Sequence, residues 1–107
     1  MTHSFAALLG TGTLLLSLHV PAQAQAADPN LARNLAATCA NCHGTDGQAR
    51  GDAAALAGMS EQRLLNTLTL YRNGTLPATI MHQITKGYTE DQLKLIAGYF
   101  AAQKPRQ

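Results

Sequence analysis

The sequence Cys39-Ala40-Asn41-Cys42-His43 decides the fold of this 107-residue chain. It places both cysteines of the chain three positions apart, and a histidine directly follows the second of them. In a helical turn these residues stand at i, i+3 and i+4, so their side chains project from one side. Two thiols and one imidazole are therefore gathered on a single short segment.

Cys-x-x-Cys-His is the attachment pattern for a c-type haem. The two thiols can add to two vinyl groups on one porphyrin edge, and the imidazole is then left beneath the ring, pointing at iron. We therefore expect one covalently bound haem c, with Cys39 and Cys42 as attachment residues and His43 as an axial ligand. A thioredoxin-like thiol pair would follow a strand in a βαβ unit, and no strand pattern is present. A zinc site that adds His82 is the other alternative, but zinc ligands normally come as two separated pairs.

The second axial ligand must come from the other face of the haem. Haem proteins that shuttle electrons usually use methionine, whose soft thioether favours Fe(II) and raises the potential. Beyond Ala26, the candidates are Met59, Met81 and His82. Met81 is favoured because a full predicted helix and a loop separate it from His43, which leaves room for the chain to wrap around the ring. Met59 follows His43 much more closely, which leaves only a short path around the ring edge.

The start of the chain, over 1–26, differs from the rest. No charged side chain occurs from Phe5 to Val20, a run rich in leucine, and Pro21 and a series of small residues follow. This pattern is typical of a secretory signal peptide, with cleavage after Ala26 or alternatively after Ala24. The prediction is thus a signal peptide over 1–26, a single domain over 27–107 and a periplasmic location. A retained membrane anchor is the alternative, although the apolar run is short for a span of about 20 residues.

Charge and size limit what the segment over 27–107 can do. The formal net charge of +2 is too small and too scattered for nucleic-acid binding. A chain of this length buries only about 60–65% of its unfolded surface, so it needs additional stabilisation from a disulfide or a cofactor. The spacing of the two cysteines provides no long-range disulfide, so a bound haem is expected to complete the core.

Periodic leucines predict an all-α chain of three or four helices. A first helix is expected from Asp28 as N-cap through the attachment motif, ended by the glycines at 44 and 47, and followed by a loop over 45–58. A second helix should start after Ser60 and stop at Gly74, and a third should run over 78–86. Thr89-Glu90-Asp91-Gln92 fits a capping box before the last helix. Its expected apolar face is formed by Leu93, Ile96, Ala97 and Phe100.

The chain resembles class I c-type cytochromes, and more narrowly the cytochrome subunit of flavocytochrome c sulfide dehydrogenase and cytochrome c4-like modules. The resemblance spans the chain from Asp28 to about Gln103. It rests on four segments: 39–47 around the attachment motif, Leu56-Ala57-Gly58, 71–75, and 78–89 with Ile80-Met81-His82 and Lys86-Gly87.

This resemblance implies a small class I cytochrome c fold, with helices wrapped around one covalently attached haem. It places Met81, not Met59, at the axial position opposite His43. It also implies that the first and last helices cross near the haem, through Leu35, Ala36, Ile96, Tyr99 and Phe100. The family commonly has a proline whose carbonyl accepts the Nδ1–H of the axial histidine. Here Ala54 takes that place, and its carbonyl can still accept the bond.

The function expected from these residues is that of a monohaem carrier of single electrons between periplasmic redox partners. No acid–base pair is evident, so no catalytic residue is expected. The alternatives are a haem subunit that accepts electrons from a sulfide-oxidising flavoprotein, and a gas or peroxide site with an open iron position. No nucleic-acid partner is expected, and the exported form is not expected to span a membrane.

Overall fold

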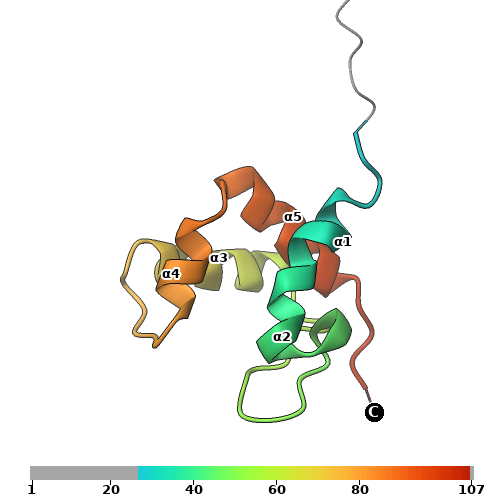
Figure 1. Ribbon diagram of the computed structural model, residues 1–107, viewed down its shortest axis with the longest axis horizontal. Helices are drawn as coiled ribbons and strands as arrows, with labels where there is room; N and C mark the ends of the chain where they lie inside the picture. Colours follow the sequence, from blue (N-terminus) through green and yellow to red (C-terminus); the bar gives the residue numbers. More distant parts are fainter. Residues whose placement is uncertain (1–26, 107) are drawn as a thin grey trace, which may run out of the picture.

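The computed structural model describes residues 27–106, so the predicted signal peptide over 1–26 lies outside the described residues. Within 27–106 the chain is helical and has no strand, which confirms the all-α prediction (Figure 1). The helical segments, in chain order, are α1 (Leu31–Ala36), η1 (Ala37–Cys39), α2 (Ala40–His43), η2 (Thr45–Gly47), α3 (Glu61–Arg72), α4 (Met81–Lys86) and α5 (Glu90–Ala101). None of the helices in this range is long and apolar enough to cross a membrane.

The core lies where α5 packs against both α1 and α3. The predicted apolar face of α5 is fully buried, and side chains of α1, α3 and the intervening loop pack onto it. The buried residues are Ala36, Leu56, Leu64, Leu68, Leu93, Ile96, Ala97 and Phe100. Because α1 and α5 cross here, the contact between first and last helices implied by the resemblance is confirmed.

Local capping signals fix the start of the two longest helices. The Thr89 hydroxyl accepts from the Gln92 N–H at 3.2 Å, and the Gln92 amide oxygen accepts from the Thr89 N–H at 2.9 Å, which completes the expected capping box. Ser60 caps α3 through the N–H of Arg63. Gly74, with a φ of 76°, lies just beyond the end of α3 in the left-handed region that favours glycine.

Two helix boundaries differ from the prediction. Asp28 accepts from the N–H of Asn30 in a turn, so α1 begins at Leu31 and not at Pro29. The expected continuous first helix is also divided by the 3-10 turn η1. The third helix begins at Met81 and not at residue 78, because Ile80 has a non-helical φ of −133°.

The C-terminal tail closes the loop that follows the attachment motif. The side chain of Gln48 donates to the carbonyl of Lys104 and accepts from the N–H of Arg106. Pro105 lies directly over Gly58, where an added Cβ would come within 2.6 Å of the proline ring. The tail over 104–106 is therefore held against the loop that follows the two cysteines.

Candidate functional site

The attachment turn is formed by η1 and α2. Cys39 is half-buried and packs against the core, whereas Cys42 is exposed, and both thiols are free. Gly44 ends the turn with a φ of 77°, and a Cβ there would overlap the carbonyl oxygen of Gln48. Only glycine fits this position, so the chain turns sharply away directly after His43.

The ring of His43 is held by one hydrogen bond. Its Nδ1 lies 2.7 Å from the carbonyl oxygen of Ala54. Because a carbonyl can only accept, Nδ1 bears the proton, and the lone pair of Nε2 is left for a metal. This bond confirms that Ala54 can provide the acceptor expected from proline in related chains. It also fixes the orientation of the imidazole before any ligand binds.

Met81 lies on α4, a separate element from the attachment turn. Figure 1 shows α4 at the left and α2 to the right of it, with α3 between them and α5 above. Met81 is the first residue of α4 and is half-buried against the core. Met59, just before α3, is also half-buried against the core, so burial alone does not distinguish the two methionines. The next residue of α4, His82, has a buried Nδ1 with no hydrogen-bond partner among the described residues.

The residues present fit a haem better than a zinc ion. Cys39, Cys42 and His43 provide two free thiols and an oriented imidazole on one turn, the set that attachment and ligation of a haem c require. No three His, Cys, Asp or Glu side chains within residues 27–106 come together as a metal site. Apolar side chains on and near α4 remain exposed, with Ile80 at 53% and Ile84 at 37%, as expected where a large apolar group would pack.

The two thiols lie in different environments. Burial raises the pKa of the Cys39 thiol above its ordinary value, and a hydrogen bond with Thr38 partly opposes this rise. Cys42 is exposed to solvent. The Cys42 edge of the attachment turn therefore faces outward, and the Cys39 edge faces the core.

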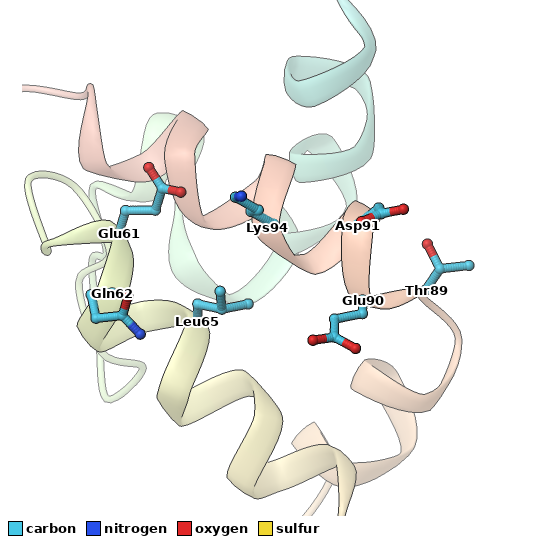
Figure 2. Close-up of a pocket in the computed structure, with 7 residues that line it drawn as sticks. All are labelled: Glu61, Gln62, Leu65, Thr89, Glu90, Asp91 and Lys94. Carbon is cyan, nitrogen blue, oxygen red and sulfur yellow. The ribbon is translucent and has the colours of Figure 1, made fainter.

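Of two hollows on the surface of residues 27–106, one adjoins the attachment turn. The larger, of about 810 Å³, lies between the start of α3 and the start of α5 (Figure 2). It is polar and includes none of the site residues predicted from the sequence: its lining is Glu61, Gln62, Leu65, Thr89, Glu90, Asp91 and Lys94. The smaller, of about 390 Å³, includes Cys42 itself together with Arg50 and Arg106.

A helical shell with a Cys-x-x-Cys-His turn defines a c-type haem protein. The family model described as Cytochrome c matches residues 30–103, and the chain belongs to the cytochrome c family. Membership implies covalently bound haem c, and Cys39, Cys42 and His43 fit its attachment motif. The resemblance noted from the sequence is thereby confirmed.

Three relatives support the narrower likeness. The chain is 38% identical over 66 residues to the cytochrome subunit of sulfide dehydrogenase from Chlorobaculum tepidum, which covers 62% of this chain and 60% of that protein. It is 41% identical over 64 residues to cytochrome c-552 of Acidithiobacillus ferridurans, covering 60% of this chain and 28% of the other. It is 34% identical over 104 residues to cytochrome c4 of Azotobacter vinelandii, covering 87% of this chain and 50% of the other.

A solved structure agrees with these relatives. Cytochrome c4 of Acidithiobacillus ferrooxidans matches with a TM-score of 0.61 and 33% identity, over 67% of this chain and 49% of that one. The class I cytochrome c fold is thus confirmed. The chain spans 60% or less of the length of each of these relatives.

Sequence reasoning did not identify two interactions close to the site. Thr38 and Tyr88 are joined by a hydrogen bond across 50 positions of the chain, and Gln48 binds the tail across 56 and 58 positions. Neither pair has a local pattern that could have revealed it, because both depend on how the helices pack.

Proposed function

We propose that this chain is an exported monohaem carrier of single electrons, with residues 1–26 removed as a signal peptide and the periplasm as its location. Cys39 and Cys42 hold the haem, and His43 and Met81 are its axial ligands. The observation that supports this most strongly is the hydrogen bond from His43 Nδ1 to the Ala54 carbonyl, at 2.7 Å. It presents Nε2 to a metal on the same turn that bears both thiols.

The proposed role of the protein residues is to keep the iron ligands in a fixed arrangement. When bound, haem c supplies an iron that accepts and releases one electron without a proton. His43 is fixed by Ala54 on one face, and the thioether of Met81 favours Fe(II) on the other. With His43 and Met81 both bound, the iron would have no open position for a gas or a peroxide. A ligand set that is the same in both oxidation states requires little rearrangement, which suits rapid transfer.

The purified protein is expected to keep its haem on the polypeptide during acid–acetone extraction. It should also titrate reversibly as a single one-electron centre and bind no carbon monoxide when reduced, because both axial positions are filled. Absorption spectroscopy during a potentiometric titration measures these properties. Haem that extracts freely would contradict covalent attachment, and rapid carbon monoxide binding would favour the open-site alternative.

A second candidate function is the haem subunit of a sulfide-oxidising complex. It is supported by the similarity to the cytochrome subunit of sulfide dehydrogenase from Chlorobaculum tepidum. In this case a flavoprotein would oxidise sulfide, and the present chain would only accept the electrons. Stable copurification with a flavoprotein that reduces the chain when sulfide is added would distinguish this function from that of a free carrier.

The surface beside Cys42 supports a particular kind of partner contact. Because Cys42 is exposed and Cys39 is half-buried, the haem edge attached at Cys42 is the one we place toward solvent. The hollow beside it is lined by the guanidinium groups of Arg50 and Arg106 and by no carboxylate. A redox partner with an acidic face would be attracted to this edge.

Replacing both Arg50 and Arg106 with glutamine should slow oxidation of the reduced protein by ferricyanide about two- to fivefold at low ionic strength. Oxidation by a cationic cobalt complex should not slow, since the lost charges repel it. Stopped-flow absorbance measures both rates. Replacing Arg63 and Arg72 of α3 with glutamine changes the net charge equally and is the matched control. Equal slowing by both pairs would show that net charge alone matters.

A further inference from the structure

One side-chain hydrogen bond joins the attachment segment to the region of α4. The hydroxyl groups of Thr38 and Tyr88 lie 2.6 Å apart. Thr38 immediately precedes Cys39, and Tyr88 lies in the short connection between α4 and α5. The other long-range side-chain bonds of residues 38–48 within the described chain lead to Ala54, to α5 or to the C-terminal tail. The bond between Thr38 and Tyr88 is thus the polar link between the two sides of the proposed haem site.

Tyr88 is in turn connected to Met81 through the backbone and one buried hydroxyl. The N–H of Tyr88 donates to the carbonyl of Thr85 at 3.3 Å. Thr85 is only 1% exposed, and its hydroxyl donates to the carbonyl of Met81 at 2.8 Å. Three hydrogen bonds, connected through the covalent structure of Tyr88 and Thr85, therefore link the residue beside Cys39 to the backbone of Met81.

Both ends of the link are held in place. The ring of Tyr88 is half-buried and packs against the core, and the next residue, Thr89, is fixed as the N-cap of α5. The hydroxyl of Thr38 also donates to the carbonyl of Leu35 at 3.3 Å. Both side chains are already held by these other contacts. Forming the hydrogen bond between them therefore costs little side-chain conformational entropy.

We propose that Thr38 and Tyr88 form a clasp that keeps α4 closed over the attachment turn and so holds the Met81 sulfur on the iron. This inference rests on the proposed function, in which Met81 is the axial ligand. α4 packs mainly against α3, and the clasp ties it to the attachment segment. Both residues act through Met81 and are positioning residues. Losing the clasp increases the fraction of molecules in which Met81 is detached and the iron is open to another ligand.

Imidazole binding to the ferric holoprotein measures that fraction. Tyr88→Phe and Thr38→Val should each tighten the apparent Kd for imidazole about three- to tenfold, the range expected for the loss of one hydrogen bond. The double variant should resemble either single variant, because both remove the same bond. Thr38→Ser keeps the hydroxyl and should restore the original Kd. Tyr71→Phe on α3 is the matched control, since its hydroxyl makes no hydrogen bond within the described residues.

The clasp is overturned if Tyr88→Phe and Thr38→Val shift the Kd no more than Tyr71→Phe, or if their effects simply add. If Tyr88→Phe fails to fold, the Thr38→Val and Thr38→Ser pair decides alone, because Thr38 is exposed and changes no core packing. Failure of the ligand assignment gives a different result: Met81→Ala would then leave the spectrum of the iron–sulfur bond unchanged. If Met81→Ala loses this spectrum but the Thr38 and Tyr88 variants do not change the Kd for imidazole, then the clasp is wrong and the ligand assignment stands.

Discussion

Replacing Met81 with alanine is expected to lower the reduction potential by on the order of 100 mV or more, within the roughly 0.8 V range that axial ligands control. The thioether stabilises Fe(II), so its loss favours Fe(III). The ferric protein should become high-spin or bind water, and it should lose the long-wavelength band of sulfur-to-ferric-iron bonding. A potentiometric titration followed by absorption spectroscopy records both changes in one experiment.

Two further variants make this result specific. Met59→Ala removes the other half-buried methionine and should leave the band and the potential almost unchanged. Met81→His should keep six-coordinate iron at a lower potential, because imidazole favours Fe(II) less than a thioether does. A native spectrum in Met81→Ala, together with its loss in Met59→Ala or His82→Ala, would show that the axial assignment is wrong.

The second large effect is expected from replacing Cys39 and Cys42 together with alanine. The described residues bury eight apolar side chains. Two of these, Ala36 and Ala97, are small, and Leu56 lies in a loop. A core of this size supplies only a few kcal/mol at most. Without its attached haem the chain should lose most of its helical content and its cooperative melting, which far-ultraviolet circular dichroism and a thermal scan would show.

The single variant Cys42→Ala is the control for this loss. It keeps one attachment residue, so a fraction of the protein should still hold haem and melt cooperatively at a lower temperature. Both variants remove the exposed Cys42 thiol, so a loss of folding seen only in the double variant comes from Cys39 and the haem that it holds. Full helicity and cooperative melting in the double variant would mean that the polypeptide folds without its cofactor.

The elements with strong local signals could be predicted from the sequence. Ser60 and the Thr89–Gln92 box satisfy N–H groups at the helix starts by themselves, so α3 and α5 begin where the sequence predicts. The apolar face of α5 follows directly from a period of 3.6 residues. These features depend on residues within one or two turns of each other.

The first and third helices were predicted less well because tertiary structure determines their bounds. η1 interrupts the first helix over Ala37–Cys39, and nothing in the local propensity of Ala37 and Thr38 indicates a 3-10 turn. Ile80 leaves the helical region before α4, although Ala78 and Thr79 are compatible with a helix. The local helical preference is weak at both places, so it does not fix the bounds of the helices.

The candidate site shows the same division. Cys39, Cys42 and His43 share one turn, so their spacing alone predicts that they act together. The Ala54 carbonyl could be placed only through the family resemblance, and the structure confirms it. The Thr38–Tyr88 bond joins two distant parts of the sequence, and its partners become neighbours only when α5 packs. The assignment of Met81 stays a prediction that the variants above test.

The crossing of the first and last helices also sets an order of assembly. Cys39 is half-buried against a core that is complete only when α5 packs on α1, and this burial raises the pKa of its thiol. The thiolate is the reactive form of cysteine, so Cys39 reacts more slowly in the finished fold than in the open chain. Haem attachment at Cys39 is therefore favoured before α5 packs on α1.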